Sequence, residues 1–134
     1  MAEGHKVLLV DDEETVREVL SVWLEEGGYH VRTATDGVEA VAEIEADCPD
    51  ILITDWRMPN MDGLELCDWL HQQDLPHPVY TLFVTVRSEV EAVVQALSAG
   101  ADDFLSKPVC ESELLGRVHL ASRRLRAGSD VTVE

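Results

Sequence analysis

The sequence predicts an α/β fold in which five βα units form a three-layer sandwich around a parallel five-stranded sheet. Short apolar runs alternate with helical patterns along the whole chain of 134 residues, as in folds built from βα units. The apolar runs are nearly continuous, which is typical of parallel strands that helices cover on both faces. With 46% hydrophobic residues, the chain has enough apolar side chains for the core of a single domain.

The N-terminal part of the chain contains two predicted βα units. Residues 6–10 form an apolar run that predicts a strand, and Gly27 and Gly28 end the helix that follows it. Residues 29–33 predict the second strand, and Asp36 is placed to cap the second helix. The apolar faces of these helices consist of Val16, Val19, Leu20, Trp23 and Leu24 in the first and of Val38, Val41 and Ala42 in the second.

The central part of the chain predicts a third and a fourth strand, at residues 51–53 and 79–84. The turn-rich segment 58–63 separates the third strand from a short helix. Pro76 and Pro78 prevent that helix from reaching the fourth strand. The apolar side of the short helix consists of Leu64, Cys67 and Leu70.

The C-terminal part predicts two helices and a short strand, at residues 103–105, between them. Ser88 and Glu91 have the spacing of a capping box, which opens the fourth helix. The apolar faces consist of Val90, Val93, Val94 and Leu97 in this helix and of Leu114, Val118, Ala121 and Leu125 in the last one. One domain is therefore predicted over residues 5–126, and residues 127–134 are expected to be a tail or the start of a linker.

The chain is strongly acidic, with 10 Lys and Arg against 27 Asp and Glu and a net charge of -17. Such a charge opposes binding to nucleic acid backbones and to anionic membranes. No apolar run has the length of a signal-peptide core or of a membrane span. We therefore expect no direct nucleic acid contact, no membrane contact and a cytoplasmic location.

Cysteine, histidine and tryptophan predict no site by their spacing. Cys48, Cys67 and Cys110 lack the pairing of a zinc site, and we expect them to be buried small side chains. The five histidines and the three tryptophans, among them Trp56, are dispersed along the chain and are expected at the surface.

Polar residues closely follow four of the five predicted strands. Asp11 and Asp12 follow the first strand, Asp55 the third, Thr85 the fourth and Lys107 the fifth. The carboxyl ends of parallel strands lie at one edge of an open sheet, so these side chains are expected to converge. The second strand offers no such group, which fits a place at the sheet margin and the strand order 2-1-3-4-5.

A cluster of three carboxylates at neutral pH has to take up a proton or bind a cation, because each like charge raises the free energy of ionising the next group. Oxygen ligands select a hard ion, and Mg²⁺ is the abundant candidate in cytoplasm. A lysine and a hydroxyl beside the metal would complete a cradle for a phosphoryl group, whose transfer is catalysed mostly by positioning and charge neutralisation. A central carboxylate can itself act as the nucleophile and form an aspartyl phosphate.

Four segments together resemble the receiver domain of two-component response regulators, the chemotaxis-regulator type in particular. They are residues 10–13 (VDDE), residues 55–63 (DWRMPNMDG), Thr85, and Lys107 with Pro108. Each motif alone is weak, but their order and spacing within five βα units extend over nearly the whole chain. The resemblance implies a flavodoxin-like fold, whose strand order is the one expected above.

The resemblance also implies the chemical role of each strand-end residue. Asp55 is the implied phosphoacceptor. Asp11, Asp12 and Asp55 are the implied Mg²⁺ ligands, together with the backbone carbonyl of Arg57. Lys107 is expected to pair with a phosphoryl oxygen.

A conformational switch is implied at Thr85 and Phe104. The Thr85 hydroxyl would move to the phosphoryl group, and Phe104 would turn inward into the space that is vacated. The surface formed by the fourth helix, the fifth strand and the fifth helix would change in response. The resemblance further suggests a cis peptide bond between Lys107 and Pro108 that aims the lysine into the site.

Three residues beside the expected site distinguish this chain within that family. Val86 replaces a residue that is usually very small, and its branched side chain is expected to crowd the approach of a phosphodonor. Arg57 and Arg87 each lie two residues after a site residue, at positions that the family varies. Their cations are expected to attract a phosphodonor or to brace the phosphoryl group.

The implied function is a phosphoacceptor module that dephosphorylates itself slowly and is not a conventional enzyme. The phosphoryl group would come from the phosphohistidine of a sensor histidine kinase or phosphotransfer protein, or from a small phosphodonor. The switched surface would control an output domain or a downstream protein, or form a phosphorylation-dependent homodimer in which Arg117 and neighbouring arginines pair across the interface.

Other interpretations are open. A metal-dependent phosphatase or phosphotransferase acting on small molecules through an aspartyl phosphate is disfavoured, because Arg57 stands where such enzymes commonly place a second acid. Taken alone, Asp11 and Asp12 fit a helix N-terminus, and Asp55 fits a turn. Phe104 alone fits a core residue. The combined pattern favours the receiver, since a purely structural role would have to hold at every strand end at once.

Overall fold

The computed structural model describes residues 5–131 and contains a parallel five-stranded sheet in the order β2-β1-β3-β4-β5. The strands are β1 (Lys6–Val10), β2 (His30–Ala34), β3 (Ile51–Thr54), β4 (Tyr80–Thr85) and β5 (Asp103–Ser106). The helices are α1 (Glu14–Glu26), α2 (Gly37–Ala46), α3 (Gly63–His71), α4 (Val90–Ser98) and α5 (Glu111–Val131). The predicted fold class and strand order are confirmed.

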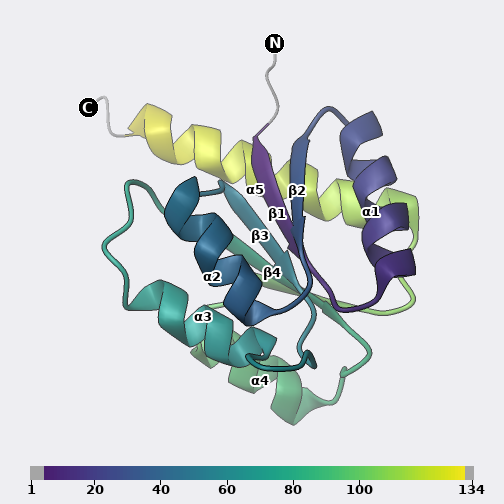
Figure 1. The fold of residues 1–134 in the computed structure, drawn as a ribbon. Coiled ribbons are helices and arrows are strands. Elements are labelled where there is room, and N and C mark those ends of the chain that lie inside the picture. The colour runs from purple at the N-terminus through teal and green to yellow at the C-terminus, as the bar shows by residue number, and fades with distance from the viewer. Residues whose placement is uncertain (1–4, 132–134) are drawn as a thin grey trace.

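Helices cover both faces of the sheet and complete the three-layer sandwich (Figure 1). On one face, Val7 and Leu9 of β1 pack with residues of α1 and α5. On the other face, Leu8 and Val10 of the same strand pack with residues of α2 and α3, while Phe83 of β4 packs with residues of α3 and α4. Successive strand side chains point to opposite faces, which explains why these strands are continuously apolar.

Helix α4 buries a different face from the one that the sequence predicts. Its fully buried residues are Ala92 and Ala96. The large apolar residues Val90, Val94 and Leu97 are instead 75%, 55% and 47% exposed. The prediction that these three residues point inward is wrong, because the small alanines let the helix lie close to a part of the sheet already filled by aromatic rings.

The predicted capping box at the start of α4 does not form. The helix begins at Val90, and its N-cap residue is Glu89, whose side chain makes no capping hydrogen bond. The carboxylate of Glu89 instead accepts hydrogen bonds from the Arg87 side chain and from the backbone N–H of Ser88. The helix therefore starts later than predicted, directly after a side-chain pair formed in the preceding loop.

Helix α5 runs to Val131. Residues 127–131, for which the sequence predicts a tail, are therefore helical, and residues 132–134 lie outside the described part of the chain. A helix that is already formed adds one hydrogen bond per residue without needing an apolar face, so the loss of periodicity after Arg126 does not mark its end. No helix within residues 5–131 is both long and apolar enough to cross a membrane.

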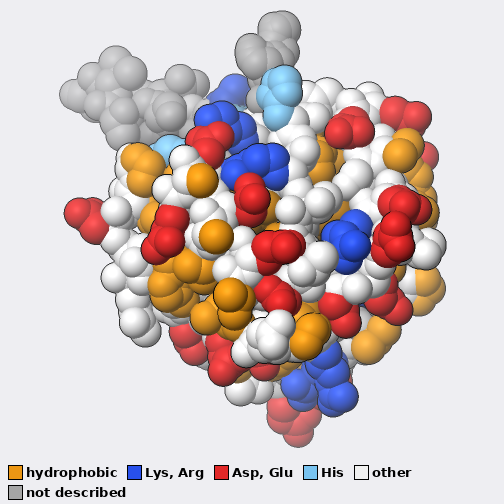
Figure 2. All heavy atoms as spheres, viewed as in Figure 1, with side chains coloured by type: hydrophobic (Ala, Val, Ile, Leu, Met, Phe, Trp, Pro, Cys, Tyr) orange, Lys and Arg blue, Asp and Glu red, His pale blue; other side chains and the backbone are white. Residues whose placement is uncertain are grey.

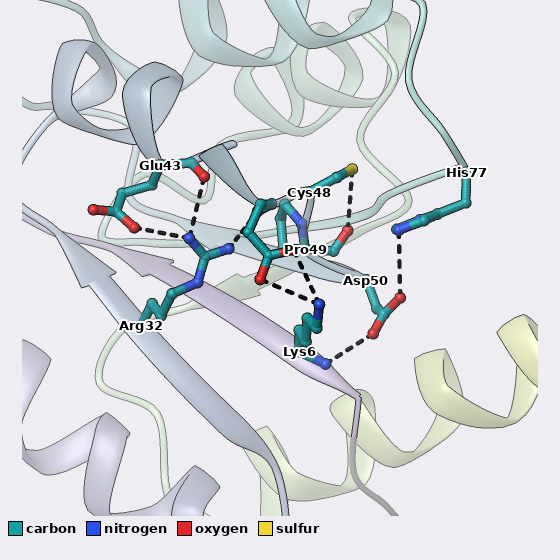
Figure 3. Close-up of polar contacts among 8 residues, drawn as sticks. Lys6, Arg32, Glu43, Cys48, Pro49, Asp50 and His77 are labelled. Atoms are coloured by element: carbon teal, nitrogen blue, oxygen red, sulfur yellow. Dashed lines mark hydrogen bonds and ion pairs between the residues drawn. The ribbon is translucent and has the colours of Figure 1, made fainter. Parts of the chain in front are cut away.

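Polar contacts near the amino ends of the strands tie β1 and β2 to the segment between α2 and β3 (Figure 3). The Lys6 ammonium lies 3.0 Å from the Asp47 carboxylate, and the Lys6 backbone N–H donates to Asp50. The Arg32 guanidinium pairs with Glu43 at 2.8 Å. These side chains are partly exposed, so each ion pair contributes little to stability on its own. Together the contacts hold the segment between α2 and β3 in place, at the edge of the sheet opposite to the carboxyl ends of the strands.

The three cysteines divide into two environments. Cys48 and Cys67 are buried as predicted, but Cys110 is exposed because it belongs to the loop before α5. Burial raises the pKa of the Cys67 thiol to about 12. Hydrogen bonds from the Ser112 hydroxyl and from the backbone N–H of Glu113 lower the pKa of the Cys110 thiol.

Acidic side chains are scattered over the face of the molecule seen in Figure 2, among apolar and neutral groups. They do not gather into one patch on that face. The excess of acidic residues in the sequence is therefore distributed over solvated surface there, which agrees with the solvation that isolated carboxylates require.

We expect substitutions on the two faces of α4 to have unequal effects on stability. Ala96→Leu should lower the free energy of unfolding by roughly 1–3 kcal/mol, because the added side chain overpacks a filled core. Val94→Ala on the exposed face should change it by no more than roughly 0.5 kcal/mol. Urea denaturation followed by circular dichroism measures both values. Equal effects of the two substitutions would contradict the assigned orientation of α4.

The cysteine environments predict selective alkylation. Because its pKa is lowered, Cys110 should reach its maximal reaction rate with iodoacetamide at a lower pH than free cysteine does. Cys67 should not react until the protein is unfolded, since its thiol is buried and its pKa is raised. Mass spectrometry of peptides after timed alkylation measures each site. The variant Cys110→Ser should lose the fast phase, and a fast phase that persists in it would refute the assignment.

Candidate functional site

Three carboxylates meet at the carboxyl ends of β1 and β3. One carboxylate oxygen from each of Asp11, Asp12 and Asp55 lies within 4.8 Å of the others. The strands bring them together because Val10 and Thr54 are register partners and the backbone N–H of Asp55 donates to the Val10 carbonyl. The convergence expected from the sequence is thus present in the structure.

The ammonium group of Lys107 lies between two of these carboxylates. Its Nζ is 2.8 Å from Asp11 Oδ2 and 2.9 Å from Asp55 Oδ2. The peptide bond between Lys107 and Pro108 is cis, as expected. Burial disfavours the charged form of Lys107, but hydrogen bonds and charges from Asp11 and Asp55 outweigh this effect and raise its pKa. The lysine is therefore a permanent cation of the site.

Asp11 is the most enclosed of the three carboxylates, at 2% exposed. Burial raises its pKa, and hydrogen bonds from Lys107 and from the backbone N–H of Glu13 oppose that shift. The Arg17 guanidinium donates to the Asp11 backbone carbonyl at 2.7 Å and so fixes the turn between β1 and α1. Glu13 belongs to the VDDE segment but has no predicted role there. The sequence pattern did not identify Arg17, whose contact spans six residues without a motif that marks it.

The loop after β3 holds Asp55 from the backbone side. The Trp56 N–H donates to Asp55 Oδ1 at 2.6 Å, and the Thr54 hydroxyl donates to the Asp55 carbonyl at 2.8 Å. Gly63 is required here, because a Cβ at this position would lie 2.1 Å from the Asp55 carbonyl oxygen. The Arg57 side chain is exposed, and the metal-binding role of its backbone carbonyl stays a prediction.

A contact that the sequence did not predict, between Asn60 and Asp36, braces the same loop. Asn60, whose φ is 71°, donates from Nδ2 to Asp36 Oδ2 at 2.6 Å. Asp36 also caps α2 by accepting the backbone N–H of Glu39, as predicted. The Glu39 N–H and then the Asn60 amide lower the pKa of Asp36. The loop that carries Asp55 is thereby anchored to the start of α2.

Thr85 and Phe104 lie on neighbouring strands beside this cluster. Thr85 is fully buried, its Oγ1 accepts a long hydrogen bond of 3.4 Å from the Arg87 N–H, and its carbonyl accepts from the Lys107 N–H. Phe104 is partly exposed and stacks on Phe83 with ring centroids 6.2 Å apart. Thr85 is the last residue of β4 and lies at the sheet edge that carries the carboxylates. Phe104 lies two residues before the end of β5, next to that edge.

Trp56 is buried, at 4% exposed, so the expectation of a surface position is wrong for this tryptophan. Its ring packs edge-on against Phe83, with centroids 5.6 Å apart. The Arg87 guanidinium lies 4.3 Å from the centroid of the same ring and pairs with Glu89 at 3.0 Å. Arg87 thus covers a buried aromatic ring, a contact that no short sequence motif signals.

Two other flanking residues have defined surroundings. Val86 is 71% exposed and lines an apolar hollow with Trp23 of α1, Lys107 and Pro108. The expected effect of Val86 on the approach of a phosphodonor stays a prediction. Arg117 of α5 pairs within its own chain, with Asp103 of β5 at 2.7 Å.

One known family combines this fold with carboxylates at the strand ends, a largely enclosed lysine and a neighbouring threonine. The sequence model of the family described as the response regulator receiver domain matches residues 7–119. The chain belongs to the response regulator receiver domain family. Members of this family generally act as phosphoacceptors in two-component signalling and bind Mg²⁺ at an acidic pocket, and this receiver domain contains a cluster of three aspartates.

The curated relatives of this receiver domain are longer response regulators. It is 41% identical over 119 residues to the alkaline phosphatase synthesis transcriptional regulatory protein PhoP of Bacillus subtilis, covering 89% of the chain and 49% of the relative. It is 44% identical over 127 residues to the response regulator MprA of Mycobacterium avium, covering 93% and 54%. The receiver domain thus spans about half the length of the curated relatives it matches.

Solved structures agree with the fold. The receiver domain of the Francisella response regulator 1452 superposes with a TM-score of 0.84 at 32% identity, covering 91% of this chain and 99% of that one. The chemotaxis protein CheY4 of Vibrio cholerae superposes with a TM-score of 0.83 at 32% identity, covering 90% and 99%. The resemblance to a chemotaxis-type receiver is confirmed at the level of fold and family.

The contacts of Lys107 predict a strong stability effect. In buffer with EDTA, Lys107→Met should lower the free energy of unfolding by roughly 3 kcal/mol, because it leaves two enclosed carboxylates without a counter-charge. Lys6→Met is the matched control: it removes an exposed ion pair and should change the free energy by no more than about 1 kcal/mol. Urea titrations measure both, and similar losses in the two variants would contradict the proposed charge balance.

Proposed function

We propose that this receiver domain accepts a phosphoryl group on the side chain of Asp55. The donor is the phosphohistidine of a sensor histidine kinase or phosphotransfer protein, or a small phosphodonor, and the transfer takes place in the cytoplasm. The observation that carries the proposal is the position of the Asp55 carboxylate, which touches the Lys107 ammonium at 2.9 Å and neighbours two further carboxylates. A nucleophile, a cation and a metal-ligand set are thus within reach of one phosphorus atom.

The donor set fits Mg²⁺. Asp11, Asp12 and Asp55 offer three carboxylates, and a single ammonium, that of Lys107, lies among them. Hard oxygen donors with surplus negative charge suit this ion, which usually keeps water and phosphate oxygens among its ligands. In our proposal these aspartates and the Arg57 carbonyl hold the metal, which when bound neutralises charge on the phosphoryl oxygens.

In the proposed reaction, Asp55 and Lys107 have different roles. A carboxylate oxygen of Asp55 forms a bond to phosphorus while the phosphorus–nitrogen bond of the phosphohistidine breaks, and the imidazole leaves with that electron pair. Lys107 pairs with one phosphoryl oxygen and releases its contact with Asp55. In the slow dephosphorylation step, water attacks phosphorus and the bond to Asp55 breaks, its electron pair going to the carboxylate. Inorganic phosphate is released and free Asp55 is regenerated.

Signalling follows from Thr85 and Phe104 in this proposal. The Thr85 hydroxyl leaves the Arg87 N–H to bind the phosphoryl group, and Phe104 turns inward. The surface of α4, β5 and α5 responds and contacts an output domain, a downstream protein or a second copy of the chain. The exposed Val90 and Val94 of α4 support a binding role for this surface, because exposed apolar patches commonly mark contact sites.

The phosphoacceptor assignment is tested with the acetyl phosphate reaction. With Mg²⁺, the wild-type chain should gain one phosphoryl group by intact mass spectrometry, and EDTA should abolish the gain. Asp55→Asn should gain none, because the amide is not a nucleophile of comparable strength. Asp68→Asn, which changes an exposed acid of α3, should behave like wild type. Equal phosphorylation of the Asp55 variant and wild type would refute the proposal.

A further inference from the structure

Arg87 is held in the loop between β4 and α4 by two contacts that have no part in the phosphorylation chemistry. Its guanidinium lies 4.3 Å from the centroid of the Trp56 ring. Its Nε and Nη2 donate to one carboxylate oxygen of Glu89, at 3.2 and 3.0 Å. The ion pair alone is weak because Glu89 is half exposed, but the buried tryptophan ring adds a cation–π contact.

The same loop holds the switch hydroxyl. The backbone N–H of Arg87 donates to Thr85 Oγ1, so the position of Arg87 determines whether this hydrogen bond can form. The side chain of Arg87 fixes that backbone by pairing with Glu89 and covering Trp56. In the proposed switch, Thr85 moves toward a phosphoryl group on Asp55, and this movement lengthens the 3.4 Å hydrogen bond unless the loop moves as well.

A row of aromatic rings connects this clamp with the second switch residue. Trp56 packs edge-on against Phe83, at a centroid distance of 5.6 Å and an interplanar angle of 66°. Phe83 stacks on Phe104 at 6.2 Å and 4°. Because Trp56 also donates its backbone N–H to Asp55, a single packed row runs from the phosphoacceptor to Phe104, with Arg87 lying on its first ring.

We propose that Arg87, Trp56 and Glu89 form a latch that stabilises the unphosphorylated arrangement of Thr85 and Phe104. Arg87 is then a positioning residue: it acts through the loop and the aromatic row and does not need to touch the phosphoryl group. Opening the latch shifts the pre-existing equilibrium toward the switched arrangement. The inference rests on the proposed function of Asp55, Thr85 and Phe104 and adds the element that sets how readily they switch.

A second role for Arg87 makes different predictions. If its cation only attracted an anionic phosphodonor, Arg87→Met would weaken anion binding and Glu89→Gln would strengthen it, and neither variant would alter Phe104 before an anion is bound. The latch predicts that both variants change Phe104 in the same direction without any anion. The two roles are therefore separated by the state of the unliganded protein.

The chain offers a simple reporter, because it contains only two phenylalanines. Labelling with 4-fluorophenylalanine gives two fluorine NMR signals, and the one missing in Phe104→Leu belongs to Phe104. Wild type with Mg²⁺ and beryllofluoride defines the switched position of that signal. The test compares Arg87→Met, Glu89→Gln and Glu91→Gln without beryllofluoride. Glu91→Gln is the matched control, since it removes the same charge from an exposed position on α4.

Both latch variants should move the Phe104 signal toward the switched position, corresponding to an increase of roughly two- to fivefold in the switched-to-unswitched ratio, the size given by a partly exposed cation–π contact. Glu91→Gln should coincide with wild type. The proposal is overturned if both latch variants also coincide with wild type, or if Glu91→Gln shifts the signal equally. A wild-type chain that does not respond to beryllofluoride would instead count against the proposed function. The latch would then be decided by whether Arg87→Met and Glu89→Gln, but not Glu91→Gln, move the Phe104 signal away from its wild-type position in the same direction.

Discussion

The ammonium group of Lys107, placed between Asp11 and Asp55, is the interaction on which the site depends. Asp11 lies 96 positions and Asp55 lies 52 positions before Lys107 in the sequence. Carboxylates this close repel each other, and their burial adds a desolvation penalty that a single well-placed cation offsets. The same contact holds the loop after β5 against the centre of the sheet. Asp12 contributes a further negative charge that Lys107 does not balance, and the proposed Mg²⁺ would neutralise this surplus.

The parallel sheet explains why so much of this site could be predicted from sequence. The strands are short, polar residues closely follow four of the five, and parallel pairing in register places those strand ends at one edge. Asp11, Asp55 and Lys107 follow from that rule alone. The bracing of the loops does not: Asn60 and Asp36 meet across 24 residues, and their contact requires a positive φ at Asn60, which no periodic pattern specifies.

The orientation of α4 was less predictable, because both its alanines and its valines could form the buried face. Apolar periodicity placed Val90 and Val94 in the core, but the space beneath α4 is filled by the rings of Trp56 and Phe83, and only a side chain as small as that of Ala96 fits above them. Burial of the aromatic residues therefore decided which face of α4 turns inward. The burial of Trp56 was not predicted because it depends on two partners that a local pattern does not reveal. Phe83 is distant in the sequence, and the guanidinium of Arg87 is carried by a long, flexible side chain.

The packing of α4 has a consequence for signalling. Burying alanine removes little apolar area from water, so α4 gains less from the core than α5 does through residues such as Leu114 and Val118. A weakly anchored element shifts at a small free-energy difference, which is what a switch between two arrangements requires. The pair Arg87 and Glu89 directly precedes the first residue of α4. A movement of this loop therefore acts directly on a helix that is less deeply anchored than α5.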